Sequence, residues 1–199
     1  MMNGVSRALL CTAVLLPAVG AAQESSATRP QSSQFNYSYV EISYDETDFD
    51  IGPFDVDGDG LTLAGSFELN EEWHAYASFG SHDLDFGIDL DTWTLGAGYA
   101  YPLREDTDLY GRVLYIDINA DAGLAAADED GLGFQFRLRS RITEEFEVEG
   151  GILYTDVIDS DTSLQAFARY YFTETLSAAL GLTFAGDTDG IGVSARYSF

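Results

Sequence analysis

The sequence predicts an all-β fold: a transmembrane up-and-down antiparallel β-barrel of about ten strands that follows a cleaved signal peptide. Three observations lead to this prediction. Segments of about ten residues alternate apolar and polar side chains, the period of a half-buried strand. Tight turns and Asp-rich loops alternate strictly between these segments. Beyond the first 22 residues, no stretch has the roughly 20 apolar residues of a membrane-spanning helix.

The first 22 residues are organised like an export signal. Arg7 gives a positive start, residues 8–19 form an apolar core too short for a membrane helix, and residues 20–22 are small, as a cleavage site requires. The only cysteine, Cys11, lies in this signal, so we expect no disulfide or thiol chemistry in the mature chain. The expected organisation is a signal peptide over residues 1–22, a flexible polar leader over 23–34 and the barrel domain over 35–199.

The alternation then continues to the end of the chain. The first segment places Tyr37 and Tyr39 on one side and Val40 on the other, and each later segment repeats this pattern. An eight-strand barrel is the alternative count. The expected strands are 36–45, 59–69, 73–83, 91–101, 108–119, 130–142, 146–156, 162–172, 176–185 and 189–199.

The connections between these strands are of two kinds. Tight turns are expected at 70–72, 102–107, 143–145 and 173–175. Mostly longer, Asp-rich loops are expected at 46–58, 84–90, 120–129, 157–161 and 186–188. An up-and-down order brings all tight turns to one end and all loops to the other, as in transmembrane barrels.

The polar face distinguishes a membrane barrel from a soluble sandwich, since both alternate. Residues 133–154 read GFQFRLRSRITEEFEVEGGILY, with an apolar face backed by arginines and glutamates. Elsewhere the polar face is often small, as at Gly96 and Gly98, which suits the interior of a narrow barrel. Aromatic residues such as Trp73 and Phe172 close the apolar stripes, as in interfacial girdles. We therefore expect the apolar face to meet lipid and the arginines to point into the lumen.

The inward charges are expected to form an ion network in the turn-side half of the lumen. The turn at 143–145 sets Arg141 opposite Glu147 and Arg139 opposite Glu149, and the turn at 70–72 sets Glu68 opposite His74. Paired charges satisfy a buried interior, whereas an unpaired buried charge is costly. A gating or selectivity role is the alternative. The expected network consists of Glu41, Glu68, His74, Arg112, Arg137, Arg139, Arg141, Glu147, Glu149, Arg169 and Arg196.

Bulky aromatic residues share this inward face, so we expect a lumen that side chains largely fill. Composition bounds the partners: 34 acidic and nine basic residues give a net charge of -25, which argues against nucleic acid. No cofactor motif is present, because Gly96 and Gly98 lie within a strand and precede no helix. The inward aromatic residues are Tyr37, Tyr39, Tyr76, Tyr110, Phe167 and Tyr171.

Two short motifs contain residue types that bind metals or catalyse reactions. Asp55, Asp57 and Asp59 match the first half of a calcium loop, but its twelfth position is Ser66, so only a looser cation site remains a hypothesis. The run 81–83 reads Ser-His-Asp, yet adjacent strand residues point to opposite faces, so His82 cannot easily meet either neighbour. We expect no enzyme activity. The alternatives are an outer-membrane enzyme and a surface protein that binds divalent cations or ligands through its acidic loops.

The end of the chain resembles the C-terminal signature of bacterial outer-membrane β-barrel proteins, with Tyr197 and the terminal Phe199 at alternate positions. Over residues 35–199 the chain is similar to the small porin-like barrels that include the OmpA and OmpX types. This resemblance implies a monomer in the bacterial outer membrane, in contact with lipid and lipopolysaccharide, whose terminal residues the barrel-assembly machinery reads. It implies a structural or surface role, or a narrow porin-like channel. The expected ten strands depart from the eight of the smallest members.

Overall fold

The computed structural model describes residues 33–51, 54–121, 123, 126–158, 160–186 and 188–199. The expected signal peptide and residues 23–32 of the expected leader lie outside these residues. The described chain forms ten strands and no helix that is long and apolar enough to cross a membrane. The strands are β1 (Tyr39–Ile51), β2 (Phe54–Glu68), β3 (Trp73–Leu84), β4 (Ile88–Arg104), β5 (Thr107–Asp121), β6 (Ala126–Arg141), β7 (Phe146–Asp156), β8 (Ser160–Tyr171), β9 (Leu176–Ala185) and β10 (Thr188–Ser198).

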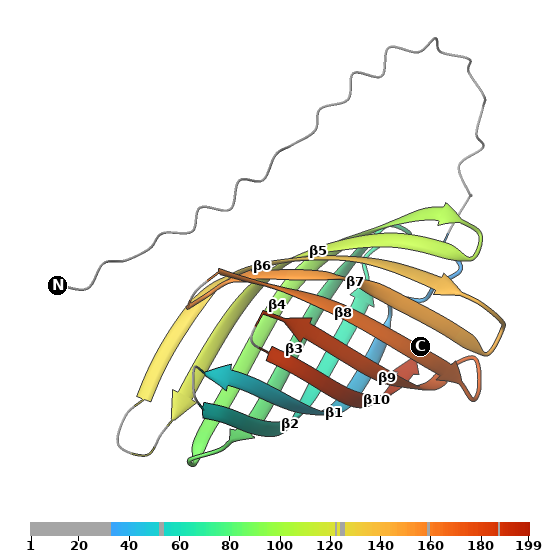
Figure 1. Ribbon diagram of the computed structural model, residues 1–199. Coiled ribbons are helices and arrows are strands. Elements are labelled where there is room, and N and C mark those ends of the chain that lie inside the picture. Colours follow the sequence, from blue (N-terminus) through green and yellow to red (C-terminus); the bar gives the residue numbers. More distant parts are fainter. Residues whose placement is uncertain (1–32, 52–53, 122, 124–125, 159, 187) are drawn as a thin grey trace, which may run out of the picture.

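All neighbouring strands pair antiparallel, and β10 returns to pair with β1, so the sheet closes into a barrel with strands oblique to its axis (Figure 1). Closure leaves no sheet edge, which is what a β structure in hydrocarbon requires. The prediction of ten strands is therefore confirmed, and the eight-strand alternative is wrong.

The barrel has two unlike ends. We call the end that carries the connections after β2, β4, β6 and β8 the turn end, and the opposite one the loop end. Residues 33–38 and the C-terminus also lie at the turn end, where the Phe199 amide donates to the Ser38 carbonyl oxygen. The turn that contains 70–72 is closed by the Leu69 amide on the Trp73 carbonyl oxygen at 2.8 Å.

The expectation of long loops at the loop end is wrong. Most of residues 46–58 belong to paired strands, with Glu46 opposite Asp59 and Asp48 opposite Asp57. Residues 126–129 likewise extend β6. Asp and Gly disfavour strands on average, but hydrogen bonds to the adjacent strand override that weak preference here.

Side chains alternate between lumen and exterior along every strand. The outward face carries a band of exposed apolar residues. Beyond this band toward the loop end, the outward positions become acidic, as at Asp57, Asp59, Asp89 and Asp130. Representative band residues are Leu61, Leu63, Trp93, Phe136, Leu180 and Val193.

Candidate functional site: the lumen

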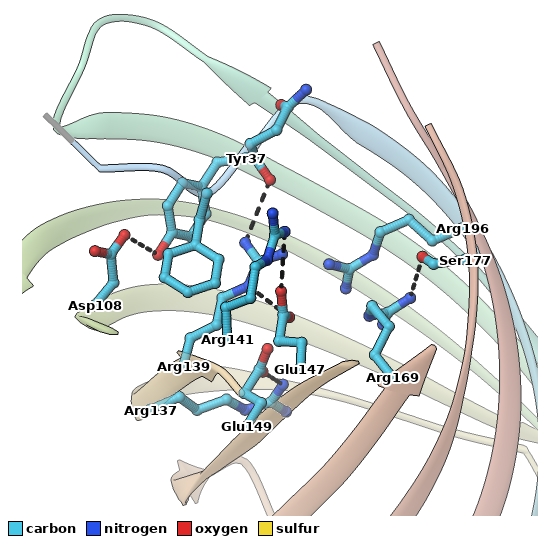
Figure 2. A network of polar contacts seen from close by, with 12 residues as sticks. Tyr37, Asp108, Arg137, Arg139, Arg141, Glu147, Glu149, Arg169, Ser177 and Arg196 are labelled. Carbon is cyan, nitrogen blue, oxygen red and sulfur yellow. Dashed lines mark hydrogen bonds and ion pairs between the residues drawn. The ribbon is translucent and has the colours of Figure 1, made fainter. Parts of the chain in front are cut away.

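Charged side chains from the five strands β1, β6, β7, β8 and β10 meet in the turn-side half of the lumen. Figure 2 shows most of them pointing toward one another across the interior. Five buried or half-buried ion pairs link them, and we call these residues the ion network. The pairs are Arg139–Glu147 (2.7 Å), Arg141–Glu147 (3.6 Å), Arg137–Glu149 (2.5 Å), Arg169–Glu41 (2.6 Å) and Arg196–Glu41 (2.7 Å).

Of the two ion pairs expected between β6 and β7, Arg141–Glu147 is present at 3.6 Å, whereas the other differs from the register by one diagonal step. Arg139 lies opposite Glu149 in the β6–β7 ladder, as the turn geometry predicted, but its guanidinium bonds to Glu147 instead. Glu149 pairs with Arg137. Diagonal neighbours remain within reach of long side chains, so register alone does not determine the partner.

Glu68 and His74 are also opposite in register but do not bond to each other. Glu68 Oε1 accepts a hydrogen bond from the Tyr37 amide at 2.7 Å. His74 is 1 % exposed, and its Nε2 accepts from Arg112 Nε at 3.0 Å. His74 fits against β4 because residue 98 is glycine: a Cβ there would lie 2.2 Å from His74 Nε2.

Side chains of the segment before β1 pack inside the turn end of the lumen. Phe35 and Tyr37 are 4 % and 3 % exposed, and their rings lie beneath the Arg139 guanidinium at 4.6 and 5.2 Å. Tyr37 donates from its hydroxyl to Asp108 Oδ2 at 3.1 Å, and the Ser33 hydroxyl donates to the same oxygen. Within this segment Phe35 and Tyr37 point into the interior, whereas Gln34 and Asn36 are exposed.

Asp108 was missed by the sequence analysis, although it is fully buried. The sequence does indicate that Asp108 points inward, because Asp108, Tyr110 and Arg112 occupy alternate positions of one strand and so share a face. Phe35 gave no such signal, since it precedes the strand and no periodicity constrains it.

A cavity of about 310 Å³ lies between the ion network and the loop end, and we call it the cup. Its floor contains guanidinium groups, including Arg112 and Arg137. Its walls are mostly small or hydroxyl-bearing, which leaves this half of the lumen unfilled. Wall residues include Ser43, Thr62, Thr183, Gly190, Gly192 and Ser194.

His82 lies at the rim of the lumen and meets a partner from another strand. Its Nε2 lies 2.6 Å from Asp45 Oδ2, reaching from β3 over β2 to β1. Gly60 makes this possible, because a Cβ there would lie 2.3 Å from the imidazole. The Ser43 hydroxyl bonds to Asp45 rather than to the imidazole, so the groups lack the Ser-to-His-to-Asp order of nucleophilic catalysis.

The hypothesis of a cation site at Asp55, Asp57 and Asp59 finds no support in the geometry. All three lie in β2, not in a loop, and the Asp57 and Asp59 side chains are exposed. Among the described residues, no group of three His, Cys, Asp or Glu side chains is placed to hold a metal ion. The terminal residues Tyr197 and Phe199 are exposed on the outward face of the barrel, 53 % and 57 % respectively.

Comparison with known proteins gives a family and several solved barrels. The family described as outer membrane protein beta-barrel domain matches residues 9–199. The β domain of the Bordetella autotransporter BrkA has a TM-score of 0.53 at 12 % identity, covering 81 % of this chain and 99 % of that one. At such identity the likeness concerns the fold alone.

Two further barrels are less similar. A KdgM porin has a TM-score of 0.49 at 8 % identity, and the attachment invasion locus protein Ail of Yersinia pestis has 0.43 at 16 % identity. Each comparison covers 81 % of this chain and 99 % of the other. No curated protein matches the sequence.

Proposed function

This chain belongs to the outer membrane protein beta-barrel domain family, and from that premise we propose that it is a monomeric surface barrel whose lumen is sealed at the turn end. It lies in the bacterial outer membrane. Members of this architecture place short turns in the periplasm, so the seal would face the periplasm and the cup the cell exterior. The barrel would serve as a structural or surface-exposed element and would not conduct bulk solutes.

The observation that carries this proposal is the occupation of the turn-side lumen by two layers of side chains. The outer layer is the segment 33–38, with Phe35 and Tyr37 buried. The inner layer is the ion network, in which Arg139 and Glu147 are 2 % and 1 % exposed. A ten-strand barrel is narrow, whereas open general porins use about 16–18 strands. The narrowness of the barrel and the filling of its turn-side lumen thus both favour a barrel that does not conduct bulk solutes.

Planar-bilayer recording of the refolded protein tests this function. We expect no steady conductance from the wild type. The double variant Phe35→Ala/Tyr37→Ala removes the outer layer and should show brief openings, whereas Gln34→Ala, an exposed neighbour, should behave as the wild type. A steady, large conductance of the wild-type protein would refute the sealed barrel. A double variant as tight as the wild type would assign the seal to the ion network alone.

The partners follow from the two surfaces of the barrel. We propose that the apolar band contacts outer-membrane lipid and lipopolysaccharide, and that the barrel-assembly machinery reads Tyr197 and Phe199. Both aromatic side chains are exposed and so are available to such a partner. We propose no catalytic role, because the arrangement of Ser43, Asp45 and His82 supports none.

A further inference from the structure

Arg112 is buried at the floor of the cup, 6 % exposed, without a carboxylate partner among the described residues. Its guanidinium donates hydrogen bonds to three neutral groups. Nε bonds to His74 Nε2 at 3.0 Å, NH1 to Gln135 Oε1 at 3.3 Å and NH2 to the Tyr39 hydroxyl at 3.2 Å. A guanidinium carries five N–H donors, so two remain after these bonds.

The cup floor as a whole has more cations than anions. Arg112, Arg137, Arg169 and Arg196 line it, against the carboxylates Glu41 and Glu149; a third carboxylate of the cup, Asp45, lies at the rim and pairs with His82. Both Arg169 and Arg196 bond to the same oxygen of Glu41, and Arg137 alone pairs with Glu149. Because a charge removed from water is costly unless an opposite charge compensates it, this floor favours an additional anion.

Arg112, which has no carboxylate partner among the described residues, is joined to Arg137 through two side-chain amides. Gln135 Nε2 donates to Gln165 Oε1 at 3.4 Å, and Arg137 NH2 donates to the same oxygen, so the two amides connect Arg137 with Arg112. Aromatic rings lie over both guanidinium groups: Tyr76 at 4.4 Å from Arg112 Cζ, and Phe167 at 4.5 Å from Arg137 Cζ. Because the rings cover the faces of the guanidinium groups, an anion meets their N–H edges. A planar carboxylate can accept two parallel hydrogen bonds from such an edge.

We propose that the cup binds a small organic carboxylate from the loop-end side, with its carboxylate at Arg112 and Arg137 and its polar body against the hydroxyl-bearing walls. The cavity of about 310 Å³ admits a molecule the size of a monosaccharide. The acidic outward positions around the loop end repel polyanions, which favours a ligand with one negative charge. This site lies beyond the proposed seal and does not depend on whether the barrel conducts.

Titration calorimetry of the refolded full chain in detergent tests this site, with gluconate as the hydroxylated monocarboxylate and glucose as its uncharged counterpart. We expect gluconate to bind at millimolar concentration or tighter and glucose not to bind. Loss of one charge-assisted contact in Arg112→Gln should weaken gluconate binding about tenfold or more. Arg104→Gln, at an exposed position outside the cup, should bind as the wild type.

A second variant protects the test against misfolding of Arg112→Gln. Thr183→Trp fills the cup from its wall without removing a member of the ion network, and it should abolish binding while the barrel still folds. Folding is read from the shift in gel mobility on heating. Equal binding of gluconate and glucose, no binding of either, or unchanged affinity in folded Arg112→Gln would overturn the proposal. Phosphate binding as tight as gluconate binding would overturn the assignment to carboxylates.

Discussion

Arg139 of β6 and Glu147 of β7 form an ion pair at 2.7 Å, one step diagonally away from the partners that the ladder sets opposite each other. Glu147 Oε2 also accepts from the Tyr171 hydroxyl at 2.9 Å and lies 3.6 Å from Arg141. One carboxylate thus compensates two guanidinium groups and joins β6, β7 and β8. This concentration of contacts on a single buried residue makes it the most sensitive position of the ion network.

Glu147→Gln keeps the shape of the side chain but removes its charge. Arg139 then becomes a buried cation without its carboxylate, so we expect a loss of about 3–5 kcal/mol in the free energy of unfolding. Urea unfolding in lipid vesicles, followed by tryptophan fluorescence, measures this loss. Glu144→Gln, in the exposed turn between the same strands, is the control and should change stability by less than about 0.5 kcal/mol.

The close approach of β3 and β4 predicts a second large effect. In Gly98→Ala the new Cβ would lie 2.2 Å from His74 Nε2 and 2.9 Å from Arg112 Cγ, so the imidazole and the guanidinium must both shift. We expect a destabilisation of about 1–3 kcal/mol in the same unfolding assay. Gly65→Ala meets nothing closer than the Tyr39 carbonyl oxygen at 3.8 Å and should be neutral or slightly stabilising. Equal effects of the two variants would contradict the tight packing around His74.

The depth of a residue in the apolar band predicts the cost of a charge. Phe136 lies outward in the middle of β6, so Phe136→Arg should cost about 2–4 kcal/mol in vesicles. Ile142, at the turn that ends the same strand, is also outward, but Ile142→Arg should cost only about 0–1 kcal/mol because the side chain reaches the interface. A larger cost for Ile142→Arg than for Phe136→Arg would contradict the position along the barrel that this account gives to the bilayer.

Removal of the terminal aromatic side chain should impair assembly of the barrel in cells but not its refolding in vitro. Phe199→Ala removes an exposed ring that makes only surface contacts, such as that with Tyr197 at 6.5 Å between ring centroids. We expect less assembled barrel in bacterial outer membranes but unchanged refolding yield in detergent. Equal losses in both settings would indicate a structural role for the ring instead of recognition by the assembly machinery.

Much of the architecture follows from alternation alone. β7 and β9 begin at the predicted residues, because each follows a tight turn that contains Glu or Thr, and both also end at the predicted residues. The inward or outward direction of each side chain followed from the same period, and so did the placement of Arg137, Arg139 and Arg141 inside. The loop-end boundaries of β1, β2, β4 and β6 were wrong because Asp-rich composition favours loops, whereas pairing such as Asp48 with Asp57 is a tertiary effect.

Contacts across the lumen were beyond the reach of the sequence. Periodicity fixes which face a residue occupies, but not which residue across the barrel it meets. The approach of His82 to Asp45 skips a strand and depends on the glycine at position 60. The packing of Phe35 under Arg139 joins segments about a hundred residues apart, and no local rule relates them.

A spin-label scan along β9 tests most directly the claim that the apolar face meets lipid while the cup is open to water. Leu182 is outward and Thr183 lines the cup, so single-cysteine labels at these adjacent positions sample opposite faces. In vesicles we expect oxygen, which concentrates in lipid, to relax the label at 182, and a water-soluble nickel chelate to relax the label at 183. Nickel access at 182 with oxygen access at 183 would invert the barrel's faces and contradict the account.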